Sequence, residues 1–105
     1  MPAAFGPSAV PVVPNASRVR GKLVRITPEP GGRGSVWEIA VHEAGDIEGM
    51  PNFARDQVGQ TIQVYVHPQL QHDLAQADQC EARVAFRGDE RGGRFVLVED
   101  DVRKL

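Results

Sequence analysis

The sequence predicts an all-β fold made of five short strands in one small domain. Segments in which apolar and polar side chains alternate recur along the chain, and glycine or proline separates them. Only one short stretch has a helical period, and nothing repeats at a fixed interval. A chain of 105 residues, 41% of them hydrophobic, is long enough to bury one modest core.

The composition argues against several other classes of protein. Cys80 is the single cysteine, so no disulfide framework is expected, and no apolar run reaches the ~20 residues of a membrane span. Residues 1–13 lack the basic and apolar regions of a secretory signal, so we expect a cytoplasmic location and no membrane partner. The net charge of −2 argues against a binder of duplex nucleic acid, which is usually markedly basic.

The first 16 residues are expected to form a flexible tail, and the barrel domain is expected over residues 17–105. The tail is rich in proline and has no charged side chain, a composition that favours extended, unpaired backbone. The alternative is a partly ordered edge strand that uses Val10, Val12 and Val13, because proline is tolerated at the edge of a sheet.

The first strand is expected at residues 18–26, where apolar and basic side chains alternate until the alternation slips at Leu23 and Val24. A period of two changes face only through a bulge or a sharp bend. Gly21 lies where such a strand would bend. Residues 27–34 combine two prolines with three glycines and are expected to form a loop.

The second and third strands are expected at residues 35–42 and 61–67. The acidic, glycine-containing stretch between them, residues 43–60, has no clear period and is expected to be a long connection with a helical turn within 52–58. Alternation gives each strand an inward and an outward face. The inward side chains of the two strands are Trp37, Ile39, Val41, Ile62, Val64 and Val66.

The rest of the chain predicts a short helix followed by a hairpin. Residues 69–79 carry apolar side chains three and four positions apart, which is typical of an amphipathic helix of two to three turns. Strands at 81–87 and 94–99 are joined by a glycine-rich turn, and residues 100–105 are expected to run across the barrel end. From this part of the chain, Leu70, Leu74, Val84, Phe86, Phe95 and Leu97 are expected to join the core.

This order of elements, with a bulged first strand at Gly21 and Val58-Gly59-Gln60 leading into the third strand, resembles the oligonucleotide/oligosaccharide-binding (OB) fold. The resemblance covers residues 17–105. It implies a five-stranded Greek-key barrel with a short helix between strands three and four that plugs one end. An SH3-like barrel, which also has five short strands but usually only a single-turn helix before the last one, is the alternative.

The resemblance also implies a ligand surface, which is the outward face of strands two and three with the two loops that flank it. Basic side chains there would hold phosphates, and an aromatic ring would stack on a base. The candidate ligand-binding residues are Arg20, Lys22, Arg33, His42, Tyr65, His67, Arg87, Arg91 and Arg94. We therefore expect a small binding module for single-stranded DNA or RNA, or for another anionic oligomer.

The alternative is a protein-interaction or accessory domain of a larger, bacterial-type assembly that binds no nucleic acid. Tyr65 is the sole aromatic residue expected on the ligand face, and the chain as a whole is acidic. Arginines that alternate with apolar residues are also typical of the solvated face of half-buried strands. The protein partner would then contact an edge strand, the proline-rich tail or the acidic loop.

No enzymatic activity, cofactor or metal is expected. The histidines and Cys80 show no paired ligand spacing, and no nucleophile, base and orienting group fall together in the sequence. The outward positions of His42 and His67 allow them to be neighbours on adjacent strands, where they would form a weak metal site at most. Surface histidines without a role are the simpler interpretation.

Overall fold

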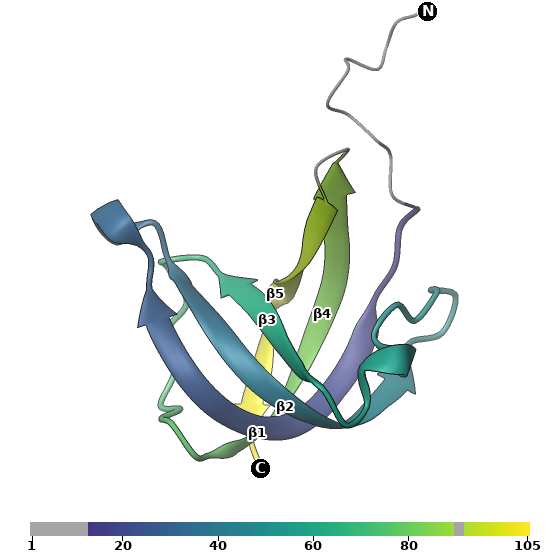
Figure 1. Cartoon of the computed structure of the whole chain (residues 1–105), viewed down its shortest axis with the longest axis horizontal. Helices are drawn as coiled ribbons and strands as arrows, with labels where there is room; N and C mark the ends of the chain where they lie inside the picture. Colours follow the sequence, from purple (N-terminus) through teal and green to yellow (C-terminus); the bar gives the residue numbers. More distant parts are fainter. Residues whose placement is uncertain (1–12, 90–91) are drawn as a thin grey trace, which may run out of the picture.

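Five β-strands close into a barrel in the computed structural model, which describes residues 13–89 and 92–105 (Figure 1). Two single-turn 3₁₀ helices accompany the strands. The elements in chain order are β1 (Ser17–Pro28), η1 (Pro30–Gly32), β2 (Ser35–Asp46), η2 (Arg55–Gln57), β3 (Thr61–Val66), β4 (Gln79–Asp89) and β5 (Gly92–Lys104). The all-β fold predicted from the sequence is therefore confirmed.

The strands are ordered β1-β2-β3-β5-β4 around the barrel, and β4 returns to β1. All neighbours are antiparallel except β3 and β5, which run parallel and are in register at Val64 with Phe95 and Tyr65 with Val96. This arrangement is consistent with an OB-like barrel. None of the helices in the described ranges is long and apolar enough to span a membrane.

The first strand bends as the slipped alternation predicts. Its register with β2 shifts between Arg20 and Gly21 and again between Leu23 and Arg25. Leu23 is fully buried, whereas the next side chain, Val24, is 41% exposed. A side-chain carbon at Gly21 would collide with the backbone carbonyl of Ala40 on β2, so only glycine fits at this crossing.

The core is composed largely of the expected residues. All six inward side chains expected from β2 and β3 are buried, and Trp37 is 1% exposed. Leu70 and Phe86 are only partly buried and pack against the core, Phe86 with its ring edge-on to Phe95 at 5.3 Å between ring centres. Cys80 and Ala82 of β4 are fully buried and complete the core.

The helix expected at residues 69–79 is absent; the described chain between β3 and β4 forms turns instead. Its backbone bonds run to β1: the N–H of Ala77 donates to the carbonyl of Leu23, and the N–H of Leu23 donates to that of Asp78. Ala77 also has a left-handed φ of 78°, which a helix cannot contain. Leu74 is nevertheless buried and caps the core as expected.

The barrel makes ordered contacts slightly before the expected boundary at Ser17. Residues 1–12 of the expected tail lie outside the described residues. Asn15 is buried, and its side-chain amide binds both backbone groups of Phe86, accepting from the N–H at 2.7 Å and donating to the carbonyl at 3.0 Å. Ala16 is also buried, and its N–H donates to the carbonyl of Pro51.

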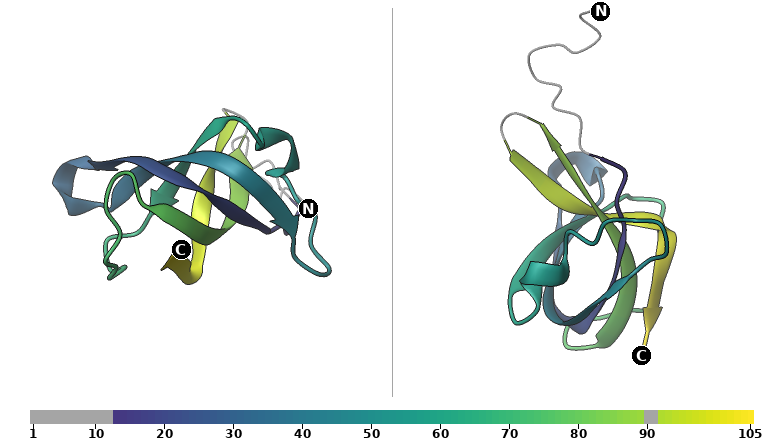
Figure 2. Two further views of the ribbon diagram at one scale, coloured as in Figure 1. Left: turned by 90° about the horizontal axis from the view of Figure 1, so that it is seen from below. Right: turned by 90° about the vertical axis from the view of Figure 1, so that its right-hand side faces the viewer.

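The last strand is longer than expected and changes direction within its length. Glu99 and Asp100 have left-handed φ angles of 58° and 55°, at the point where the register between β4 and β5 shifts. After this bend β5 pairs with the first residues of β4, from Cys80 to Ala82 (Figure 2, yellow strand). The bend brings the outward side chains of β5 against those of β1 and β4.

Candidate functional site

An arginine and a tyrosine stack on the outer surface where β3 meets β5. Tyr65 points outward from β3 opposite Val96 of β5, and Arg94 lies two residues earlier on the same outer face. The guanidinium carbon of Arg94 is 4.3 Å from the centre of the Tyr65 ring, within the range of a cation–π interaction. The pair presents a flat, positively charged surface to solvent.

The loop between β1 and β2 lies against the same ring. The hydroxyl of Tyr65 donates a hydrogen bond to the carbonyl of Arg33 at 2.6 Å. Gly34 has a φ of 99°, and a side-chain carbon there would collide with the carbonyl of Val66, so glycine is required for this close approach. The loop and the β4–β5 hairpin therefore meet over β3, where Tyr65 contacts the backbone of Arg33 and the guanidinium of Arg94.

A second arginine faces Arg94 across the hairpin. Arg87 of β4 is the register partner of Arg94, and both side chains are exposed. Like charges placed directly opposite each other usually destabilise an antiparallel pair. A groove of about 420 Å³ lies here, and its lining residues are Arg87, Gly88, Gly92, Gly93, Arg94 and Val96. The glycines leave the backbone of the groove accessible, and the two guanidinium groups make its edges cationic.

Three other basic candidates do not reach this site or cannot be placed in it. Arg20 points to the opposite side of β1, where its Nε is 2.9 Å from a carboxylate oxygen of Glu81 on β4. Lys22 is exposed and lies between Ala40 of β2 and Gln79 of β4. Arg91 lies outside the described residues.

His42 and His67, which outward alternation allowed to be neighbours, lie toward opposite ends of the β2–β3 pair. His67 directly follows β3, whose last residue pairs with Ser35 at the start of β2, whereas His42 lies toward the far end of β2. The Nε2 of His67 contacts the carboxylate of Asp100, and this hydrogen bond raises the pKa of the imidazole. Over the described ranges, no three potential ligands gather to hold a metal.

The thiol of Cys80 lies in the core beneath β1. Burial raises its pKa to about 11, so it remains protonated near neutral pH. A protonated, buried thiol is a poor nucleophile and a poor metal ligand. Cys80 is therefore a small core residue in these surroundings.

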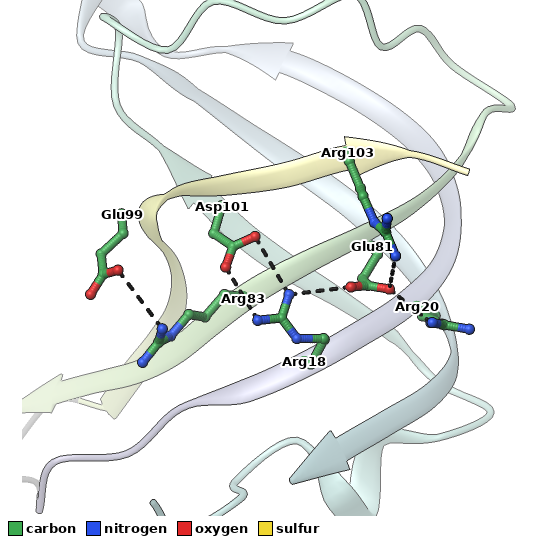
Figure 3. Close-up of polar contacts among 7 residues, drawn as sticks. All are labelled: Arg18, Arg20, Glu81, Arg83, Glu99, Asp101 and Arg103. Atoms are coloured by element: carbon green, nitrogen blue, oxygen red, sulfur yellow. Dashed lines mark hydrogen bonds and ion pairs between the residues drawn. The ribbon is translucent and has the colours of Figure 1, made fainter. Parts of the chain in front are cut away.

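The carboxylates that pair with the arginines of β1 and β5 were not predicted from the sequence. Glu81 is 5% exposed, although it points outward, because arginine side chains from β1 and β5 cover it (Figure 3). Its carboxylate is 3.2 Å from Arg18, 2.9 Å from Arg20 and 3.1 Å from Arg103. The hydrogen bond from Arg103 contributes most to lowering the Glu81 pKa. No signal within one strand reveals such a cluster, because it depends on register between strands.

Arg94 also has a carboxylate partner, which was not among the candidate residues. Glu29 lies between β1 and η1, and its Oε1 is 3.8 Å from Nη1 of Arg94. The ion pair connects the β1–β2 loop with the β4–β5 hairpin.

Comparison of the chain with protein-family models, with curated proteins and with solved structures finds no match. The candidate site is therefore defined by its own geometry alone.

Proposed function

We propose that the chain is a non-enzymatic, OB-like binding module for single-stranded DNA or RNA, or another anionic oligomer. The observation that supports this most directly is Arg94 stacked on Tyr65 while facing Arg87 across the hairpin. A cationic groove and a flat stacking surface are the two features that binders of single strands combine. The single free cysteine suits the cytoplasmic location that is part of the proposal.

In this proposal the groove takes the backbone of the ligand and the stacked pair takes a base. Arg87 and Arg94 contact phosphate oxygens, and the bare glycine backbone between them allows close approach. Because Arg94 covers one face of Tyr65, the base stacks on the guanidinium plane or replaces it on the ring. Arg33, which is exposed in the β1–β2 loop, extends the cationic surface for neighbouring phosphates.

Titration with a fluorescent oligothymidylate of about 12 nucleotides, a length within the site sizes of OB folds, tests this function. We expect affinity to fall steeply between about 50 and 200 mM salt, because phosphate contacts release counterions. Absence of binding at ~100 μM in low salt, the weak end of non-specific affinity, contradicts the proposal. Polyphosphate of similar length is the second probe and separates recognition of charge from recognition of bases.

Variants locate the site on the barrel. Tyr65→Leu removes the stacking ring and is expected to weaken oligothymidylate binding by about 1–3 kcal/mol with little effect on polyphosphate. Arg94→Gln is expected to weaken the binding of both oligothymidylate and polyphosphate. Arg55→Gln is the matched control, because Arg55 is also exposed and ion-paired, 2.9 Å from Asp46, but lies in η2 beyond the other end of β2. Equal losses for Arg94→Gln and Arg55→Gln would exclude this site.

A protein-interaction role is the second candidate, and the connection between β2 and β3 favours it. This connection exposes three large apolar side chains, Met50, Phe53 and Val58, with exposed fractions of 37%, 39% and 49%. Capture of one stoichiometric protein partner that survives nuclease treatment would support this role. Loss of that partner in Phe53→Ser, with retention in Tyr65→Leu, would place the contact on the connection rather than on the candidate site.

A further inference from the structure

The guanidinium of Arg94 has two internal partners at once. It lies over the ring of Tyr65, and it forms the ion pair with Glu29 described above. The Glu29 side chain is 34% exposed and the Arg94 side chain is 55% exposed, so solvent reaches both groups. The carboxylate of Glu29 is therefore already paired with the guanidinium of Arg94, to which the proposed function assigns a phosphate.

We propose that Glu29 is an internal competitor for the anionic ligand: a phosphate of the bound strand displaces the Glu29 carboxylate from Arg94. This inference rests on the proposed function and adds a residue that sets the affinity of the same site. An ion pair this exposed contributes little to stability, so its loss is a small obstacle to binding. A phosphate offers two oxygens to the guanidinium fork and forms the stronger pair.

The loop that carries Glu29 is held by contacts that do not involve its carboxylate. The backbone N–H of Glu29 donates to the carbonyl of Gly34 at 2.9 Å, and the Tyr65 hydroxyl binds the next carbonyl back along the chain, that of Arg33. Replacing the carboxylate with the amide of the same shape leaves these bonds in place. Glu29→Gln therefore tests the charge of Glu29 rather than the fold of the loop.

Glu38 provides a matched control on the neighbouring strand. Its Oε2 is 3.7 Å from Nε of Arg25, nearly the same separation as in the Glu29–Arg94 pair, and its side chain is 27% exposed. Glu38 lies on the outer face of β2 opposite Gln63 of β3, beside the candidate site. Glu38→Gln therefore removes the same charge from the same region but leaves Arg94 paired.

The experiment compares oligothymidylate affinities in low salt for the parent chain, Glu29→Gln, Glu38→Gln, Arg94→Gln and the double variant Glu29→Gln with Arg94→Gln. We expect Glu29→Gln to bind about two- to fivefold more tightly than the parent, as removal of an exposed competing ion pair implies. Glu38→Gln is expected to gain less, and the gain from Glu29→Gln is expected to vanish in the Arg94→Gln background, because neighbouring groups act non-additively.

Two outcomes overturn the inference while leaving the proposed function in place. One is an equal gain for Glu29→Gln and Glu38→Gln, which would show a general charge effect. The other is a gain from Glu29→Gln that persists undiminished without Arg94. If no variant binds the oligothymidylate, Glu29→Gln included, the proposed function fails and this inference fails with it.

Discussion

Gly21 pairs with Val41 of β2 and with Cys80 of β4, one residue before the pairing with β4 ends, and its α-carbon faces the carbonyl of Ala40. We expect Gly21→Ala to destabilise the fold by about 2–3 kcal/mol, because the new methyl group forces the two strands apart. Gly45 is the matched control: it also lies in a strand, and its nearest neighbour would be the Arg18 carbonyl at 3.7 Å, an ordinary contact. Urea denaturation of both variants measures the difference, and equal midpoints would contradict this role of Gly21.

The bend at Gly21 could be predicted from the sequence, whereas the role of Asn15 could not. The slip in alternation at Leu23 and Val24 is a local signal, and the register shift after Leu23 confirms it. Asn15 instead binds the backbone of Phe86, a residue 71 positions away, and nothing in a proline-rich stretch marks one amide for such a contact. Composition predicts the average behaviour of a segment, but it does not predict a single hydrogen-bonded contact with a distant part of the chain.

Glu81 connects three strands, since Arg18 and Arg20 of β1 and Arg103 of β5 all donate to its carboxylate on β4. Because the hydrogen bonds from Arg103 and Arg20 lower its folded pKa below the ordinary 4.5, its stabilising contribution is present above that value and is lost as the pH falls through the lowered folded pKa. We expect Glu81→Gln to lose about 1–2 kcal/mol near neutral pH and to lose less stability on acidification than the parent.

Glu48→Gln is the control for that measurement, because Glu48 is exposed in the turn that follows β2 and is not a register partner of any of the three arginines. The free energy of unfolding of the parent and both variants is measured by urea denaturation between pH 3 and 7, the range that brackets ordinary carboxylate pKa values. Identical pH profiles for the parent and Glu81→Gln would show that the cluster does not link β1, β4 and β5 energetically.

The pair formed by His67 and Asp100 joins the end of β3 to the bend of β5. Its hydrogen bond raises the folded pKa of His67 above 6.5, so its contribution to stability is complete below 6.5 and is lost as the pH rises through the folded pKa. Asp100→Asn keeps a residue that tolerates the left-handed backbone and is expected to lower the His67 pKa. Titration of the His67 ring protons by NMR measures this pKa.

Asp101→Asn is the control for the histidine titration, because the carboxylate of Asp101 binds Arg18 on another side of β5. The variant removes the same charge one residue away and is expected to change the His67 titration far less than Asp100→Asn. If the two substitutions shift it equally, the general charge of the bend, and not the hydrogen bond from Asp100, sets the pKa.

The strands were more predictable than the segment between β3 and β4. Alternation is a property of each strand alone, so the inward residues of β2 and β3 were identified correctly. The spacing of Leu70 and Leu74 satisfied a helical period, and both residues do contact the core. The backbone nevertheless bonds to Leu23 of β1, a tertiary contact that overrides a weak local preference.

For the whole molecule, alternation predicted which side chains face outward but not which of them meet. Tyr65 meets the backbone of Arg33 and the side chain of Arg94 because the two loops converge over β3. Arg20 was expected near them, yet it lies with Glu81 on the other side of β1. Register between distant strands decides both outcomes, and one sequence without coordinates contains little information about register.

The parallel ladder between β3 and β5 is short, so we expect the barrel to open most easily between these two strands. Backbone pairing there spans two positions, whereas β1 pairs with β2 from Ser17 to Pro28 with two register shifts. Of the amide protons of Val64 and Tyr65, the one that points toward β5 should therefore exchange with solvent sooner than those of Ile39 or Val41. A ligand that contacts both Tyr65 and Arg94 links β3 to β5 and stabilises their pairing. At ten times its Kd, such a ligand should slow amide exchange between these two strands about tenfold. An exchange rate that is unchanged by bound oligothymidylate would mean that the oligonucleotide binds elsewhere on the protein.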